Sequence, residues 1–452
     1  MNSRRKADIG PAAKAARSAA LQDAGALPWR RQISSGRGVR RAAPLWIACL
    51  VAAAWSATTN AAQTLGLHTA LEVRAGYADE NSRWRDGDDA SLFDVAGTLR
   101  PLWSAQRDDL KLTAELEITA TTGDTLERAD VVALTGSNPE NDLFDASHVW
   151  STGERHRNEA RLDRLALTWT PAWGTVTAGR HAVTWGGGLV FNPFDLFNPF
   201  APGDVIRDYK VGADMLHVDV PLADGGFQLL AVGRRSPVSG RAATDASSFA
   251  ALWQRRIGSR EVALMSAWHY DEPVLGVGIA GLLGDASWRI DGTWLRVRPP
   301  GFSTTEDYIA LVANLQYSWI WANRNVFGFL EYHHNSLGHS AVASGFSDPY
   351  LLTQIARQNV FLLGRDYAAA SLQVELHPLV NAFVSVIANL RDPSVLLQPR
   401  VVWNASNRMQ VTAGLDLPIG ARGTEFGGFD PGDSLGTTRA PRSAYVRATW
   451  DW

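Results

Sequence analysis

The sequence predicts a transmembrane antiparallel up-and-down β-barrel of about 18 strands. Three observations predict it. Apolar and polar residues alternate in segment after segment, short connections mostly alternate with long ones, and the last segment alternates up to an aromatic C-terminal residue. Segments of about ten residues with one apolar and one polar face are typical of strands that cross a membrane in a closed sheet.

The N-terminal region, residues 1–62, is expected to be an extension followed by a cleaved signal peptide. An apolar run at 43–55 follows basic residues and precedes small ones, which is the order of a secretory signal. The one cysteine, Cys49, lies in that run, so the mature chain is expected to have no disulfide and no thiolate metal site. Ten Lys or Arg and two Asp are removed with the signal, so the formal charge changes from −3 to about −11, which argues against a nucleic-acid partner.

Residues 63–452 are then a single barrel domain. The segment LKLTAELEITA alternates apolar residues with polar ones that include Glu115 and Glu117, and YIALVANLQYSW does the same with Asn314 and Gln316. The candidate strands begin near residues 67, 91, 110, 160, 174, 214, 227, 247, 261, 274, 286, 307, 325, 360, 381, 394, 408 and 442. Their number is even, as is usual for bacterial outer-membrane barrels.

The connections and the tryptophans predict the orientation. Long connections at 123–159, 185–213, 335–359 and 419–441 are expected on the extracellular side, and short turns on the periplasmic side. Tryptophans recur near the periplasmic ends of strands, as expected for an aromatic girdle at headgroup depth. They are Trp103, Trp169, Trp253, Trp319, Trp403 and Trp452.

The C-terminal segment RSAYVRATWDW resembles the assembly signal of bacterial outer-membrane proteins. That resemblance implies recognition by the barrel-assembly machinery. The partners expected from the membrane itself are outer-membrane lipid and lipopolysaccharide.

The stretch GGGLVFNPFDLFNPFAPGD, residues 186–204, is kept out of regular structure by its glycines and prolines. Exposing four phenylalanines to water would be costly. The loop at 185–213 is therefore expected to fold into the lumen and constrict it, with Phe191, Phe194, Phe197 and Phe200 packed on the inner wall.

The same region resembles a segment of porin-like outer-membrane barrels that reads GRQ-x-x-x-WG-x-G-x-x-x-NP-x-D. The matching residues are Gly179, Arg180, Trp185, Gly186, Gly188, Asn192, Pro193, Asp195, Asn198, Pro199, Asp208, Tyr209, Gly212 and Asp214. His181 departs from the usual Gln. The resemblance implies a porin or related channel in the cell outer membrane, passing small solutes by diffusion, and trimerisation is common among porins.

Charged residues of the loop are the candidate solute contacts. They are Asp195, Asp204, Arg207, Asp208 and Lys210. Arg180 interrupts the alternation of Val176 and Ala178, so a bulge is expected to turn it inward. Opposed charges across a constriction select solutes by charge and dipole, although the same charges could pair and hold the loop to the wall. Parity predicts further pore-lining residues, namely Glu115, Glu117, Asn314, Gln316, Arg365 and Arg400.

The sequence also bears on other functions. His334 and Ser336 have a spacing that resembles outer-membrane phospholipase, but no orienting Asn motif follows, so an enzyme is not expected. Alternation begins near Leu67, which leaves no room for the plug domain of an active transporter. A barrel for export or uptake of polysaccharide or hydrophobic compounds, or a scaffold for a partner protein, stays open as the alternative. No cofactor and no metal are expected.

Overall fold

The computed structural model describes residues 62–85, 89–128, 142–207, 209–236, 239–430 and 436–452. The predicted extension and signal therefore lie outside the described residues, apart from Ala62, and so does Asp208.

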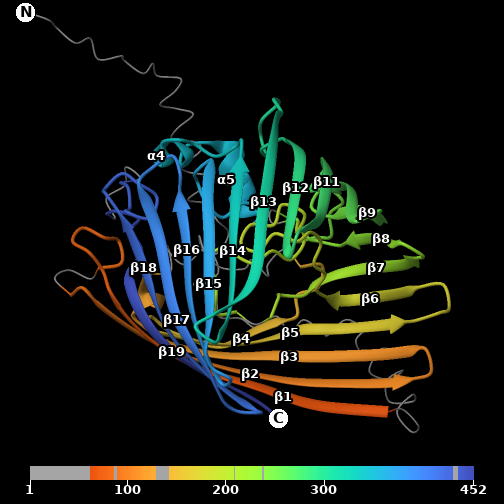
Figure 1. The fold of residues 1–452 in the computed structure, drawn as a ribbon, viewed down its shortest axis with the longest axis horizontal. Helices are drawn as coiled ribbons and strands as arrows, with labels where there is room; N and C mark the ends of the chain where they lie inside the picture. Colours follow the sequence, from red (N-terminus) through yellow and green to blue (C-terminus); the bar gives the residue numbers. More distant parts are fainter. Residues whose placement is uncertain (1–61, 86–88, 129–141, 208, 237–238, 431–435) are drawn as a thin grey trace, which may run out of the picture. The chain divides into compact units, whose positions relative to one another are not determined.

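Eighteen strands form one closed antiparallel sheet in which each strand pairs with the next and β19 pairs with β1 (Figure 1). The strands are β1 (Ala62–Tyr77), β2 (Ser91–Arg107), β3 (Leu110–Gly123), β5 (His156–Trp169), β6 (Thr175–His181), β7 (Ala213–Leu222), β8 (Gly225–Val232), β9 (Ser248–Ile257), β10 (Arg260–His269), β11 (Glu272–Leu283), β12 (Ala286–Val297), β13 (Glu306–Trp321), β14 (Arg324–Asn335), β15 (Asp366–His377), β16 (Val380–Asn389), β17 (Ser394–Ser406), β18 (Met409–Gly420) and β19 (Arg442–Asp451). The predicted fold class and strand number are confirmed. The predicted start of one strand near 360 falls six residues before β15.

The outer face of the barrel is apolar. On β13, Ile309 and Leu315 are 53% and 41% exposed, whereas Val312 and Asn314, which point the other way, are buried. Exposed Leu, Val, Ile, Phe and Trp side chains occur on nearly every strand of the barrel. An apolar surface of this extent far exceeds the few hundred Å² usual for a protein in water, so it requires an apolar surrounding such as lipid.

None of the helices in the described part of the chain combines the length and the apolarity needed to cross a bilayer.

The connections at one end of the barrel are short, and several at the other end are long and carry extra elements, although short turns join β10 to β11 and β16 to β17 there. The loop after β3 holds the 3-10 helix η3 (Asp124–Arg128) and a further strand, β4 (Ser147–Thr152), whose partner in the sheet is β5. The loop after β14 holds α4 (Val342–Gly345) and α5 (Pro349–Ala356), where the Asp348 carboxylate accepts hydrogen bonds from two backbone amides of the first turn. Sequence alternation did not predict η3, α4 and α5, because it is a signal for strands alone, and β4 is a strand of six residues that lies within the long connection predicted at 123–159.

The chain leaves the wall after His181 and returns at Ala213, and residues 182–207 and 209–212 run through the lumen between distant strands (Figure 1). We call this segment the lumen loop. The inner faces of β7 to β13 form an apolar core with Trp185, Phe194 and Phe197 of the lumen loop and Leu351 of α5. The strand members of this core are Ala213, Met215, Leu230, Val232, Ala250, Leu252, Ala263, Met265, Ala267, Val274, Leu295, Val297 and Tyr308.

The inner faces of β16 to β19 and of β1 to β5 are mainly polar. Their inward side chains include Ser385, Gln398, Arg400, Asp416, Tyr445, Arg447, Glu72, Arg74, Arg100, Glu115 and Asp163. We refer to β7–β13 as the apolar half of the barrel and to β16–β5 as its polar half.

Candidate functional site: the lumen loop and its vestibule

The Glu331 carboxylate of β14 holds the lumen loop across the barrel. It accepts hydrogen bonds from the consecutive backbone amides of Leu189, Val190 and Phe191, at 2.6, 2.9 and 2.7 Å. Asn314 of β13 donates its side-chain amide both to this carboxylate and to the Gly187 carbonyl, at 3.2 and 3.1 Å. Three amides that point in one direction fit a single anionic acceptor, so this contact fixes the backbone of the loop.

Three of the four phenylalanines predicted to pack on the inner wall are buried, whereas Phe200 is only partly buried, with the Lys210 Nζ 5.5 Å from its ring centre. Phe191 stacks on His333 at 4.4 Å between ring centroids. Phe194 is fully buried, and Gly276 of β11 gives it room, because a Cβ there would come within 2.8 Å of its ring. Phe197 packs edge-on against Trp185. Burying a phenylalanine stabilises by roughly 1.5–3 kcal/mol, so these side chains anchor the loop, and their contact with a solute stays a prediction.

The loop charges pair with one another. Lys210 forms an ion pair with Asp195, and burial raises the pKa of the Asp195 carboxyl although Lys210 opposes the shift. Arg207 pairs with Asp204 at 3.1 Å. The second pair is more exposed than the first, with 42% of the Arg207 side chain accessible. The pairing favours a structural role for Asp195 and leaves Arg207 able to meet a solute.

Arg180 is placed differently from the prediction. β6 pairs with β5 and with β7 in regular register through this residue, so the expected bulge is wrong. Its guanidinium is 3% exposed and donates to the Asp214 carboxylate and to the carbonyls of Phe144 and Leu162. Arg180 thus joins β6 and β7 to the segment that precedes β4, and it offers no free donor to the lumen.

The residues predicted by parity lie mostly on the inner wall. Glu115 and Glu117 pair with Arg100 of β2, the latter at 3.2 Å. Gln316 shares the inner face of β13 with Asn314. Arg365 lies one residue before β15 and donates to the Gly338 carbonyl at 2.9 Å, so it belongs to the loop end of the barrel.

Arg400 on β17 donates to the Ser385 hydroxyl at 3.2 Å, and its guanidinium lies 4.4 Å from the centre of the Phe383 ring. Both of these contacts are with neutral groups.

A vestibule adjoins the lumen loop. Its empty volume is about 950 Å³, which includes space open to solvent. Its walls come from the loop, from the end of β8, from Tyr270 after β10 and from the segment that follows α5. Five cations and two carboxylates line it, namely Arg161, Arg207, Lys210, Arg234 and Arg357 with Asp142 and Asp204. The carboxylates that pair with Lys210 and Arg357 have side chains only 4% exposed, so they lie behind the surface.

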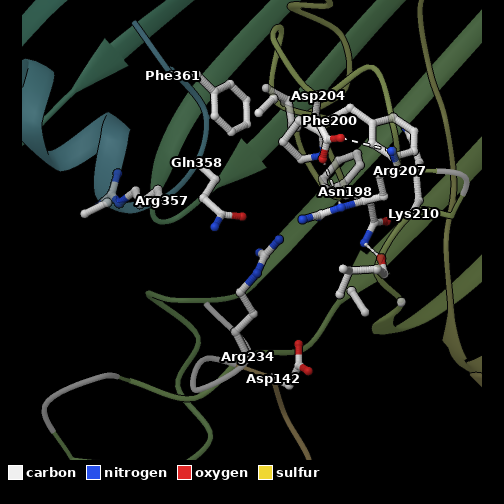
Figure 2. A pocket seen from close by; sticks show the side chains of 18 of the residues that line it. Asp142, Asn198, Phe200, Asp204, Arg207, Lys210, Arg234, Arg357, Gln358 and Phe361 are labelled. Carbon is white, nitrogen blue, oxygen red and sulfur yellow. Dashed lines mark hydrogen bonds and ion pairs between the residues drawn. The ribbon is translucent and has the colours of Figure 1, made fainter. Parts of the chain in front are cut away.

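Figure 2 shows Arg234 pointing into this space, below Gln358 and beside the loop residues Arg207 and Lys210. The Tyr270 ring orders two of the cations, because Arg234 and Arg357 each place a guanidinium 4.7 Å from its centre. Arg234 also donates to the Ser248 hydroxyl at 2.6 Å. The two guanidinium groups therefore lie together at one wall of the vestibule, where Arg234 is 8% exposed.

Sequence reasoning missed Arg161, Arg234, Tyr270 and Arg357 as vestibule residues and Glu331 as the anchor of the loop. Parity could have placed Arg161 and Glu331, which lie on predicted strands. The other three lie outside strands, where alternation carries no signal.

Neither a protein-family model nor a curated protein matches the chain. Among solved structures, a BenF-like porin from Pseudomonas fluorescens Pf-5 is similar over 87% of this chain and 99% of its own, with 7% identity and a TM-score of 0.50. The fold is that of a porin barrel. OccAB2 of Acinetobacter baumannii is similar over 88% of this chain and 99% of its own, with 9% identity and a TM-score of 0.49. OccK2 of Pseudomonas aeruginosa, solved with glucuronate, is similar over 86% of this chain and 96% of its own, with 8% identity and a TM-score of 0.48. At 7% identity the likeness to the BenF-like porin establishes the fold alone.

Proposed function

We propose that this protein is an outer-membrane channel through which small polar or charged solutes diffuse passively, with a preference for anions. The observation that carries the proposal is the vestibule, where five cationic side chains and two carboxylates face an open space directly above the lumen loop. Fixed charge of one sign in a narrow, low-dielectric passage raises the local concentration of the opposite ion.

Three further features support a channel. The outer face of the barrel is apolar around its circumference, so the barrel suits a bilayer. The polar half keeps ionised side chains on the inner wall, which a dry interior would not tolerate at this density. The lumen loop narrows the passage at the level where Glu331 and Asn314 hold it.

The alternatives are less well supported. The vestibule is lined mainly by charged and polar groups, which does not favour a route for hydrophobic compounds. Lipid contact follows from the apolar outer face. Recognition of β19 by the assembly machinery and a homotrimer stay predictions, as does the resemblance of 179–216 to the porin segment.

The test is a planar lipid bilayer with the purified protein and a KCl gradient across it. Discrete conductance steps with a reversal potential on the anion-selective side are the expected result. Arg234→Gln should move the reversal potential towards that of a neutral pore, because it removes one of the vestibule cations. Arg296→Gln is the control, since this arginine pairs with Asp307 outside the vestibule at 2.7 Å. A folded protein that gives no steps, or that prefers cations, would contradict the proposal.

A further inference from the structure

We propose that His269, the last residue of β10, is a positioning residue of the channel. It does not line the vestibule, but a chain of hydrogen bonds through its ring holds Arg234 to the segment that follows α5. The anion preference depends on this chain. The inference rests on the proposed channel function and adds residues that act on it from behind the vestibule wall.

The chain of hydrogen bonds begins at Glu272, the first residue of β11, which is 3% exposed. One oxygen of its carboxylate accepts from the Arg357 guanidinium at 2.6 Å and from the Gln354 side-chain amide at 3.2 Å. The other oxygen accepts from the backbone amide of Arg298 at 2.7 Å. Because a carboxylate only accepts, the nitrogen of the Gln354 amide must face it.

This orientation fixes the direction of the next bonds. The Gln354 amide oxygen accepts from the Asn359 side-chain nitrogen at 2.7 Å. The Asn359 oxygen then faces His269, whose Nε2 lies 3.1 Å away. A ring nitrogen that bonds to an amide oxygen must carry the proton, so His269 is protonated at Nε2. A neutral imidazole of this tautomer presents Nδ1 as an acceptor.

The chain ends at the vestibule arginine Arg234. His269 Nδ1 lies 2.8 Å from the Ser248 Oγ, so the Ser248 hydroxyl donates to it. The same oxygen accepts from the Arg234 guanidinium at 2.6 Å. Ser248 and His269 are 0% and 1% exposed, so these bonds are shielded from solvent, where hydrogen bonds are stronger. His269 thereby connects Arg234 with the residues that hold Arg357.

The Tyr270 ring closes the circuit between the two arginines. Both guanidinium groups lie 4.7 Å from its centre, and the His269 ring packs edge-on against it, also at 4.7 Å between ring centroids. The circuit therefore joins the end of β8, the strands β9, β10 and β11 and the segment after α5 into one unit. Displacing one member moves the others.

The chain holds Arg234 on neutral groups. These are the Ser248 hydroxyl, the Tyr270 ring and the Ala246 carbonyl, the last at 3.4 Å. Asp142 lines the same vestibule beside Arg234 (Figure 2), and the backbones of the two residues form a β-bridge. An arginine released from Ser248 can turn to this carboxylate. An ion pair there would reduce the positive charge that Arg234 offers to an anion.

Reversal potentials in a KCl gradient test the role of His269. Ser248→Ala removes the link to Arg234 with little change in volume. It should lower the chloride-to-potassium permeability ratio by about half or more of the decrease that Arg234→Gln produces. His269→Phe keeps an aromatic ring without the ring nitrogens and should act alike. Ser104→Ala on β2 is the matched control, because Ser104 is also buried and its hydroxyl bonds to Thr64 at 2.6 Å.

A double variant distinguishes a positioning role from a general disturbance. If Ser248 acts through Arg234, then Arg234→Gln combined with Ser248→Ala should have the permeability ratio of Arg234→Gln alone, whereas independent effects would add. An additive decrease would overturn the proposal. An unchanged ratio in both Ser248→Ala and His269→Phe would overturn it as well.

Asn359→Leu extends the test to a residue outside the barrel strands, so the barrel can close without it. It removes the acceptor of the His269 Nε2 and should lower the ratio in the same direction, by less than Ser248→Ala. An unchanged ratio here would overturn the link to the segment after α5. A wild-type protein without current or without anion preference would instead refute the proposed function, which separates the two failures.

Discussion

The two halves of the barrel use one strand pattern for different purposes. In both, side chains alternate between an apolar outer face and an inner face. In the apolar half the inner residues pack against the lumen loop and α5 and fill the space beneath the vestibule. In the polar half they form ion pairs along the wall. Alternation therefore specifies a membrane barrel, while the chemistry of the inner face decides where side chains and loop fill the lumen.

The largest loss of stability should follow from disrupting the core of the apolar half. Phe194→Ala removes a fully buried ring between the loop and β10 and β11, and we expect it to lower the free energy of unfolding by about 3–5 kcal/mol. Urea titration in detergent measures this. Phe200→Ala is the matched control, because this ring is only partly buried and should cost about 1 kcal/mol or less. Equal losses in the two variants would mean that the core does not anchor the loop.

A smaller loss of stability should follow from weakening the contact between Glu331 of β14 and the lumen loop. Glu331→Gln replaces an anionic acceptor of three amides by a neutral one with a single acceptor oxygen, and we expect a loss of about 1–3 kcal/mol. Trypsin should then cleave faster after Arg207, which is partly exposed in the loop. Glu375→Gln, at a turn, provides the control, since its carboxylate binds the exposed Asn325. Cleavage rates that match wild type would show that the aromatic contacts suffice.

The smallest predicted effect is on the pH dependence of stability. Glu425, in the loop before β19, has a pKa raised by burial, although hydrogen bonds from Tyr367, Leu363 and Asn389 oppose the shift. A carboxyl with a raised pKa binds its proton more tightly in the folded state. The contribution of Glu425 to the free energy of unfolding should therefore be most favourable at low pH. It should fall as the pH rises from the ordinary pKa of a Glu carboxyl to the raised pKa of Glu425.

Unfolding of wild type and Glu425→Gln across this pH window measures the effect, because the variant lacks the titrating group. The difference in the free energy of unfolding between the two proteins should change with pH in the acid range and stay constant above it. A pH-independent difference, or one of the opposite sign, would contradict the assignment.

Much of the fold could be predicted from the sequence because alternation is a local property. The strands around Glu115 and Asn314, the inward loop and its buried phenylalanines all follow from spacing and the cost of exposing apolar rings. Arg180 was misplaced because a break in polarity resembles a bulge, whereas here another segment of the chain covers the arginine. Glu331 and Tyr270 gained their roles from partners far away in the sequence, and no local pattern specifies such partners.

The pairing of the lumen loop with Glu331 and Gln398 also has a consequence for assembly. Both partners lie far along the chain from the loop residues that they bind. Glu331 follows Phe191 by 140 residues, and Gln398 follows Gly203 by 195 residues. When β6 and β7 have formed, the surfaces that receive the loop do not yet exist, and long-range contacts of this kind form late. The lumen loop can therefore reach its final position only when the residues of β14 and β17 that hold it are also in place.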